Sequence, residues 1–309
     1  MYLLSVIIPV YNASSWLGEC MSSILDSLQN ASDVQIVLID DGSTDCSGTM
    51  CDEYAAQYPF VEVVHKPNGG VASARNSGLE IAVGQFISWI DPDDYVHPSW
   101  FPKISPILRK ENPDILVFDT MRFDEYHTSP EIYGRDSGWI PRKTFISDVF
   151  RDIRMLSGLT NKIIRTALLA GIRFNTALPI LEDFHAMPRI LEQIQTVYYL
   201  PECLYYYRQH SESLLHHVTP NRAFLSVEIA RQRVCDVSEE YRAAADTAAA
   251  IQALAFCTNQ RNCQDFSADT AQLHSCRRYI LTKLPLLFLD RDVPLRQKIK
   301  FFLAAFGLY

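Results

Sequence analysis

The sequence predicts an α/β protein with a mostly parallel sheet flanked by helices, followed by a helical C-terminal region. Strand-like and helix-like segments alternate over the first hundred residues, which is typical of a parallel sheet covered on both faces. Polar clusters follow several of these strands, and such sheets bind ligands beyond the carboxyl ends of their strands. From about residue 220 the pattern is helical throughout.

The expected strands are short, β-branched and almost free of charge, as strands buried on both faces are. Between them, apolar residues recur at helical spacing. We expect strands at 3–10, 34–39, 60–65, 85–90 and 114–118. We expect helices at 16–28, capped by Ser14 or Ser15, at 45–57, capped by Ser43 or Asp45, and at 71–83.

The second half of the chain is less regular. Residues 120–142 are polar and predict a β-excursion or a mobile loop. Helices are expected at 143–152, at 160–170 and from Leu181 onward, and short strands at 196–200 and 204–207. We place the boundary between a first domain, residues 1–217, and a helical region, residues 218–309, in the polar stretch before residue 220.

Composition limits the possible functions. The chain has 309 residues and a net charge of −8, so no nucleic-acid partner is expected. Its eight cysteines include no Cys-x-x-Cys pair, which gives no support for a zinc ribbon. The start of the sequence lacks the features of a signal peptide, and no apolar run is long enough to span a bilayer. These features predict a protein of the reducing cytosol.

Three carboxylates lie within four residues after the strand at 85–90. Asp91, Asp93 and Asp94 repel one another unless a cation offsets their charge, and Mg²⁺ or Mn²⁺ commonly binds one or two such carboxylates. The alternative is an acidic surface turn before the helix near Pro98. The spacing alone leaves both possibilities open.

A second acidic pair, Asp40 and Asp41, follows the strand at 34–39. The segment is similar to an aspartyl-phosphate signature, but its register is one residue short, which argues against that mechanism; a turn that caps the next helix is the simple alternative. A glycine-rich dinucleotide loop and a Walker A loop are both absent from the sequence. A nucleotide would instead use the Tyr11 ring for stacking, Asp40 as an acceptor and Arg75 for phosphate.

Taken together, four motifs resemble the inverting GT-A glycosyltransferases of family 2, particularly bacterial enzymes of capsule, exopolysaccharide, O-antigen and teichoic-acid synthesis. The motifs are Ser5–Asn12 (SVIIPVYN), Ile39–Asp45 (IDDGSTD), Asn68–Leu79 (NGGVASARNSGL) and Asp91–Asp94 (DPDD). Their order and spacing also match, over about residues 1–215. The resemblance implies the GT-A fold, with a nucleotide-sugar half at about 1–119 and an acceptor half at about 120–217.

The resemblance also implies a donor site for a nucleotide sugar, expected to be a UDP-sugar, with Mn²⁺ or Mg²⁺. Asp93 and Asp94 would hold the metal, and the division of roles among the three carboxylates stays open. The implied donor-binding residues are Pro9, Val10, Tyr11, Asn12, Asp40, Asp41, Asn68, Gly70, Arg75, Asp91, Asp93 and Ser213.

Two further segments are similar to catalytic motifs of the family. Asp183, in Leu181–Phe184 (LEDF), would be the general base that takes the proton of the acceptor hydroxyl, with Glu182 positioning the site. Without the resemblance, an acidic first helical turn would explain both residues. Arg208 would neutralise the leaving diphosphate, aided by Ser213 and His210.

Three other features complete the prediction. Asn161 and Lys162 also fit the family and would contact donor or acceptor. The Gln-x-x-Arg-Trp motif of processive members is absent, which favours one sugar per encounter. Near the C-terminus, Arg296, Lys298 and Lys300 alternate with apolar residues, so this segment would either touch an anionic membrane surface or pack as an ordinary helix.

The sequence and the resemblance therefore predict a cytosolic, metal-dependent, inverting glycosyltransferase, and the C-terminal segment adds the hypothesis of peripheral contact with the inner face of the plasma membrane. Its acceptor would be a saccharide or a lipid-linked saccharide, and the oligomeric state stays open. Two alternatives remain. One is a non-catalytic nucleotide-binding scaffold of a glycan-assembly complex, and the other is a sugar-phosphate nucleotidyltransferase, whose glycine-rich N-terminal loop is not seen in the sequence.

Overall fold

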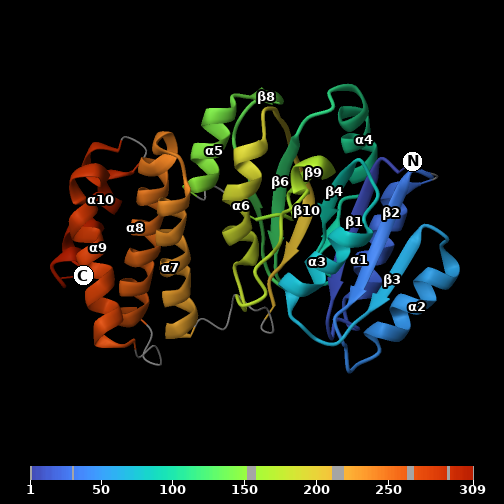
Figure 1. Ribbon diagram of the computed structural model, residues 1–309, viewed down its shortest axis with the longest axis horizontal. Helices are drawn as coiled ribbons and strands as arrows, with labels where there is room; N and C mark the ends of the chain where they lie inside the picture. The colour runs from blue at the N-terminus through green and yellow to red at the C-terminus, as the bar shows by residue number, and fades with distance from the viewer. Residues whose placement is uncertain are drawn as a thin grey trace. The chain divides into compact units, whose positions relative to one another are not determined.

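The computed structural model describes residues 2–29, 31–151, 158–210, 219–262, 268–290 and 293–308 (Figure 1). The chain forms two compact units. The first comprises Met1–Phe145 and Arg154–Ser211, and the second comprises Ile146–Ile153 and Glu212–Tyr309. The domain boundary expected at residue 217 lies outside the described residues.

The first unit is built on a mixed ten-stranded sheet in the order β3-β2-β1-β4-β9-β6-β10-β5, with β7 beside β6 and β8 beside β10. β1 runs parallel to β2 and β4, while β9 runs antiparallel between β4 and β6. The strands are β1 Leu4–Val10, β2 Val34–Asp40, β3 Val61–His65, β4 Phe86–Trp89, β5 Tyr95–Val96, β6 Ile115–Phe123, β7 Thr128–Glu131, β8 Gly138–Ile140, β9 Lys162–Arg165 and β10 Val197–Arg208.

The strand predictions are largely confirmed. All five strands of the first 118 residues form, and the segment 120–142 contains the β-excursion β7–β8. The helix expected at 160–170 is wrong, because this stretch forms β9 and a short 3-10 helix, Thr166–Leu169. Ile163 and Ile164 are fully buried between two other strands, where β-branched residues pack well. The two short strands expected at 196–207 form one long strand with register shifts near Cys203.

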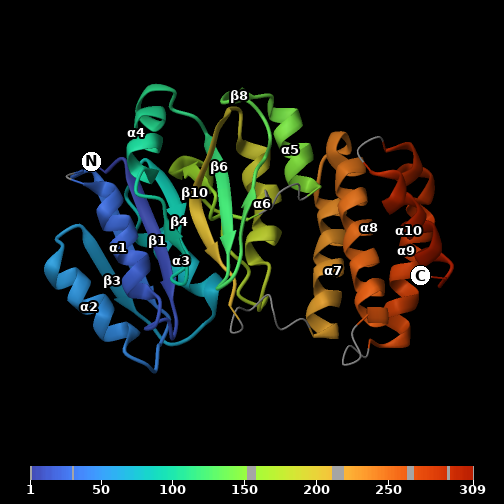
Figure 2. The same cartoon turned by 180° about the vertical axis from the view of Figure 1, so that it is seen from behind.

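Helices cover both faces of this sheet. The helices of this unit are α1 Leu17–Leu28, α2 Ser47–Gln57, α3 Val71–Ile81, α4 Trp100–Lys110 and α6 Glu182–Gln193. A further helix, α5 Arg142–Phe150, begins in the first unit, and its residues from Ile146 onward belong to the second. α3 lies on the face seen in Figure 1, and α1 lies on the face seen in Figure 2. Val6 and Ile8 of β1 join the core that α1 covers, while Ile7 points to the opposite face. There α3 approaches the strand so closely that a Cβ at Gly78 would lie 2.4 Å from Ile7 Cγ2.

The expected cap of α1 is wrong. The N-cap residue is Trp16, and no side-chain hydrogen bond caps the helix. Ser14 instead donates its main-chain N–H to Asp45 Oδ2 at 3.0 Å. This contact joins the loop after β1 to the loop after β2, which places both strand-end clusters at one edge of the sheet.

The second unit is helical, as expected. Its helices are α7 Pro220–Asp236, α8 Glu239–Asn262, α9 Thr270–Leu289 and α10 Leu295–Ala305. The side chains of Thr219 and Asp269 cap α7 and α9. A separate core packs α8 against its neighbours around fully buried Phe256 and Phe301.

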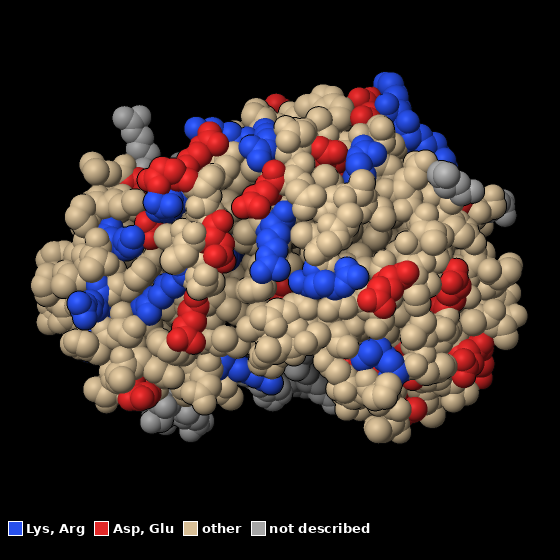
Figure 3. All heavy atoms as spheres, viewed as in Figure 1, with Lys and Arg blue, Asp and Glu red and all other residues tan. Residues whose placement is uncertain are grey.

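Charged side chains of both signs are interspersed over the face seen in Figure 3. Within the part of the chain that the structure describes, every helix is too short or too polar to cross a membrane.

Candidate active site

The loop after β1 is tied to the loop after β2 by main-chain contacts. Asn12 has a left-handed φ of 48°, its main-chain N–H donates to Ser43 Oγ at 3.1 Å, and its Oδ1 accepts from Thr44 N–H at 2.8 Å. The Tyr11 side chain is 51% exposed and is available for stacking. Pro9 and Val10 are buried within β1, so only their main chain lies at this strand end.

The Asp40 carboxylate is held by two partners, Ser43 and His65, at the end of β2. It accepts from Ser43 N–H at 3.0 Å, and its other oxygen lies 2.8 Å from His65 Nδ1. His65 Nε2 is also 3.0 Å from Asp52. Burial acts to raise the pKa of Asp40, but the hydrogen bonds from Ser43 and His65 outweigh it and lower that pKa. The same contacts with Asp40 and Asp52 raise the pKa of His65.

Asp41 fixes the loop that leads into α3. Its buried carboxylate accepts from Gly69 N–H and from Gly70 N–H, at 3.1 and 2.7 Å, and forms an ion pair with Lys66. Gly70 has a φ of +81° and occupies the N-cap position of α3. Asn68, in the same loop, is exposed.

Arg75 lies deeper than the sequence suggested. Its side chain, expected at a base or diphosphate, is buried and forms ion pairs with Glu182 and with Asp91, the latter at 3.2 Å. One guanidinium therefore joins the carboxylate cluster after β4 to the first turn of α6. Burial raises the pKa of Glu182, and the charge of Arg75 opposes this shift without cancelling it.

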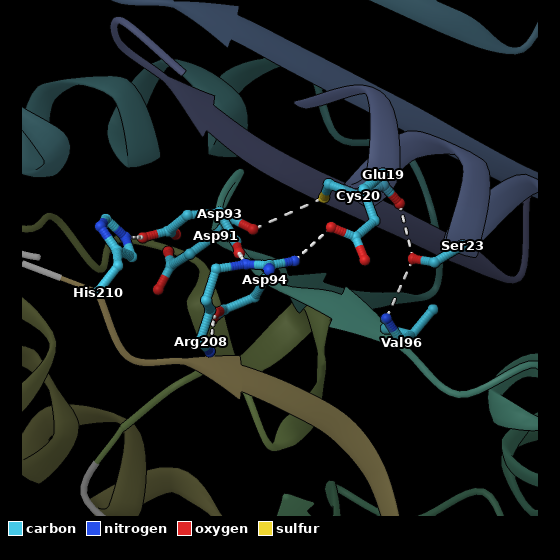
Figure 4. Close-up of polar contacts among 9 residues, drawn as sticks. All are labelled: Glu19, Cys20, Ser23, Asp91, Asp93, Asp94, Val96, Arg208 and His210. Atoms are coloured by element: carbon cyan, nitrogen blue, oxygen red, sulfur yellow. Dashed lines mark hydrogen bonds and ion pairs between the residues drawn. The ribbon is translucent and has the colours of Figure 1, made fainter. Parts of the chain in front are cut away.

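The carboxylates after β4 converge with the end of β10 (Figure 4). Asp94 is almost fully buried and accepts from Tyr205 Oη at 2.5 Å and from Arg208 N–H at 2.7 Å. Asp93 Oδ2 lies 2.9 Å from His210 Nε2. Burial, followed by the charges of Asp93 and Asp91, raises the pKa of Asp94 well above its usual range.

The guanidinium of Arg208 is enclosed by α1 and aromatic rings. It forms an ion pair with Glu19, and Nε donates to the Asp93 carbonyl at 2.8 Å. The same group lies 4.6 Å from the Trp16 ring centroid and 4.7 Å from that of Phe123. Figure 4 shows Glu19 reaching from α1 toward Arg208. The arrangement places one cation directly beside the carboxylate cluster.

Asp183 occupies the first turn of α6, next to the buried Glu182. Leu181, the residue before them, adopts a left-handed φ of 63°, which costs about 1 kcal/mol or more for a side chain of this size. Asp183 Oδ1 accepts from Phe184 N–H at 2.6 Å, and the side chain is only partly buried. Glu182 therefore pairs with Arg75, while Asp183 accepts from the main chain, and its charge acts on Arg75, Asp91 and Glu182.

Three remaining predicted residues have different positions. Lys162 is buried and donates to the Gly158 carbonyl at 2.6 Å and to Asn161 Oδ1 at 2.7 Å, so the two side chains contact each other within the fold. Ser213 lies outside the described residues.

The carboxylate cluster offers donors that suit a hard divalent cation. Asp93 Oδ2 and His210 Nε2, which lie 2.9 Å from each other, are one oxygen and one nitrogen ligand for such an ion. Both carboxylate oxygens of Asp94 already have hydrogen-bond partners. The described residues include no preassembled group of three metal-ligating side chains. Two protein donors are nevertheless compatible with Mg²⁺ or Mn²⁺, because these ions commonly take most of their ligands from phosphate and water.

Several contact residues were missed by the sequence analysis. Trp16 is the N-cap residue of α1 and Glu19 lies in its first turn, and the apolar pattern of this helix indicates only a core element. His65 is the last residue of β3. Tyr205 lies in the strand expected at 204–207 and was not identified as a site residue, although it contacts Asp94. Each of these residues contacts a site residue more than twenty positions away in the sequence. The only local signal was therefore a side chain capable of polar contacts at the end of a strand or helix.

Comparison with known proteins gives the family. The sequence model described as Glycosyl transferase family 2 matches residues 5–177. The chain therefore belongs to glycosyl transferase family 2, and its activity class is glycosyl transfer.

Two relatives and one structure illustrate the similarity. The chain is 28% identical to Glycosyltransferase GlyG of Streptococcus pneumoniae, over 69% of this chain and 73% of that protein. It is 32% identical to the Minor teichoic acid biosynthesis protein GgaB of Bacillus subtilis, over 67% of this chain and 23% of that much longer protein. The structure of S. aureus TarS 1-349 in complex with UDP-GlcNAc matches with a TM-score of 0.72 at 19% identity, covering 100% of this chain and 88% of that one. The fold is the GT-A fold that TarS has.

Proposed function

We propose that this protein is an inverting, metal-dependent glycosyltransferase that uses a UDP-sugar donor and a saccharide or lipid-linked saccharide acceptor. The observation that carries the proposal is that the carboxylate cluster Asp91–Asp94 lies against Arg208. Arg75 joins the same cluster to the first turn of α6, where Asp183 lies. The complex of TarS with UDP-GlcNAc supports a UDP-sugar as the donor.

The proposed reaction is a single in-line displacement at the anomeric carbon. Asp183 accepts the proton of the acceptor hydroxyl as its oxygen attacks from the face opposite to the leaving group. Arg208 stabilises the negative charge that develops on the leaving diphosphate, because Glu19 and the Asp93 carbonyl hold its positive guanidinium in place beside the carboxylate cluster. An α-linked donor then gives a β-linked product.

Mn²⁺ or Mg²⁺ would be held by Asp93, with His210 and Asp94 beside it, and would neutralise charge on the donor diphosphate. The support is electrostatic. Burial and the charges of neighbouring carboxylates raise the pKa values of Asp91 and Asp94, so their ionised forms are disfavoured and a bound cation would stabilise them.

The nucleotide-binding part of the proposal rests on the strand-end loops of β1 and β2. Tyr11 would stack on the base, with Asn12, Asp40, Asp41, Asn68 and Gly70 shaping the pocket. Arg75 would support the site through its ion pairs with Asp91 and Glu182, without contacting the donor itself.

The biological setting is proposed from the relatives. A teichoic-acid protein among them supports a role in cell-surface polysaccharide synthesis. We propose addition of one sugar per encounter, a cytoplasmic location and a division into a catalytic domain, residues 1–217, and a helical region, residues 218–309. Peripheral contact with a membrane is the last part of this proposal.

Replacing the proposed base tests the catalytic assignment. Asp183→Asn keeps the size of the side chain but removes its basicity, so we expect turnover to fall by about 10²–10⁴-fold while UDP binding is retained. The measurement is UDP release from a panel of UDP-sugars with Mn²⁺ and candidate acceptors. Asp26→Asn, an exposed carboxylate on α1, is the matched control and should leave turnover unchanged.

Undiminished transfer by Asp183→Asn would remove Asp183 from the mechanism. Release of pyrophosphate in place of UDP would identify a nucleotidyltransferase. UDP binding without product from any donor and acceptor pair would favour the non-catalytic scaffold.

A further inference from the structure

Helix α10 has two apolar faces instead of one. Phe301 and Ala304 point into the core of the second unit, where both are almost fully buried. Leu295, Ile299, Phe302 and Phe306 follow a spacing of four, three and four residues, which puts them together on another face. Their exposed fractions are 71%, 51%, 45% and 54%. We call these four residues the outer stripe of α10.

The outer stripe is flanked by basic side chains. At 100° per residue, Arg296 and Lys300 fall on one side of the stripe and Lys298 on the other. Lys298 Nζ also donates to the Phe288 carbonyl at 2.8 Å, which joins α10 to the end of α9. Long basic side chains beside an apolar stripe can keep their charge at a polar boundary while their stems contact apolar surface.

Helix α9 also exposes large apolar side chains. Leu281, Phe288 and Leu289 are 44%, 46% and 83% exposed, although their neighbours Ile280 and Leu287 are buried in the core. Residues 270–309 contain seven basic and two acidic residues, while the whole chain has a net charge of −8. Positive charge is thus concentrated where apolar side chains are exposed.

We propose that the outer stripe of α10 docks into the interface of an anionic lipid bilayer, with the helix lying in the membrane plane. An interfacial helix has this combination of an apolar face and flanking Lys and Arg, and the phosphate groups of anionic lipids complement its charge. A symmetric pair of α10 helices fits less well, because each would bring its three basic residues, with no acidic residue, against the same three. This inference rests on the membrane contact in the proposed function and names the surface that makes it; because docking is measured without any sugar donor, its failure leaves the proposed transfer reaction untouched.

Co-sedimentation of the full chain with vesicles tests the proposal. We expect binding to vesicles of phosphatidylglycerol and phosphatidylethanolamine, little binding to pure phosphatidylcholine, and release by salt, since screening weakens the attraction of basic residues to lipid phosphate. The Phe302→Ser/Phe306→Ser variant should bind at least about tenfold more weakly, because two large apolar side chains no longer enter the lipid. Arg296→Glu should weaken binding to anionic vesicles by about fivefold or more.

The matched control is Val83→Ser/Tyr126→Ser, which removes two apolar side chains that are 61% and 78% exposed in the first unit. It should bind vesicles as the unmodified chain does. Circular dichroism on all variants establishes that the exposed positions were changed without unfolding.

Several outcomes would overturn the proposal. It fails if the chain does not bind anionic vesicles, if it binds phosphatidylcholine equally well, or if both double variants lose binding equally. It also fails if sedimentation velocity without lipid shows a dimer that only Phe302→Ser/Phe306→Ser dissociates, because a second copy would then cover the stripe.

Discussion

The acidic clusters at the ends of β2 and β4, the two strands that flank β1, have opposite electrostatic characters. Asp40 and Asp41 accept hydrogen bonds mainly from nearby loops, and the pKa of Asp40 is lowered. Asp91 pairs with the buried Arg75, and Asp94 contacts Tyr205 and Arg208, more than a hundred positions away. Burial raises the pKa values of Asp91 and Asp94. The carboxylates of the first cluster have hydrogen-bond donors from the surrounding loops and Lys66. The second cluster gathers three carboxylates at the point where a cation and an anionic donor would bind.

The comparison teaches that an acidic motif after a strand is not by itself a metal site. Asp41 has a buried carboxylate with three donors, two of them main-chain N–H groups, and it orders the loop before α3. Asp93 has a histidine as its partner and stays partly exposed. The difference lies in what surrounds each carboxylate, which the local sequence does not reveal.

The largest effect on stability is expected from Arg75, the buried cation of the second cluster. Arg75→Gln leaves Glu182 and Asp91 without their shared ion pair, and we expect a loss of about 3–5 kcal/mol in the free energy of unfolding. Urea unfolding measures it. The double variant Arg75→Gln/Glu182→Gln should recover part of the loss, because one uncompensated charge is removed; no recovery would mean that Arg75 acts mainly through packing.

A smaller loss is expected in the first cluster. Asp41→Asn removes the charge opposite Lys66 and leaves one acceptor oxygen for three donors, so we expect a loss of about 1–3 kcal/mol. Thermal unfolding measures it, with Asp26→Asn as the exposed control. A loss as large as that of Arg75→Gln would erase the distinction between the two clusters.

The smallest effect is a pH dependence carried by His65. Its pKa is raised in the folded state by hydrogen bonds to Asp40 and Asp52, so its stabilising contribution is present below the ordinary pKa of about 6.5 and is lost as pH rises through the raised value. Unfolding measured between about pH 6 and 8 should show this loss in the unmodified chain but not in His65→Gln. His127→Gln is the control, and an identical pH slope in all three would contradict the assignment.

The sequence predicted the strands that position the site better than it predicted the contacts between the site residues. The strands ending before Tyr11, Asp40 and Asp91 form because their buried, β-branched runs have a clear pattern, and their polar ends follow from the topology of a parallel sheet. Ile163 and Ile164 were misassigned because a short apolar run does not distinguish a buried strand from a helix.

The partners of each functional residue were the part that could not be predicted. The ion pair of Arg208 with Glu19 joins residues 189 positions apart, and that of Arg75 with Glu182 spans 107 positions. Such contacts depend on the order β1-β4-β9-β6-β10 in the sheet, which local patterns do not specify. The same limit applies to Phe301, whose burial beside the exposed Phe302 follows only from the packing of α10 on α9.

The central claim is that the Asp91–Asp94 cluster requires a divalent cation to accept a nucleotide diphosphate, whereas the Asp40–Asp41 cluster does not. Calorimetric titration of the protein with UDP, with and without Mn²⁺, tests it most directly. We expect UDP binding that depends on Mn²⁺ and that loses this dependence in Asp93→Asn. Equal UDP affinity in the presence and absence of Mn²⁺, or a full metal response in Asp93→Asn, would contradict the account.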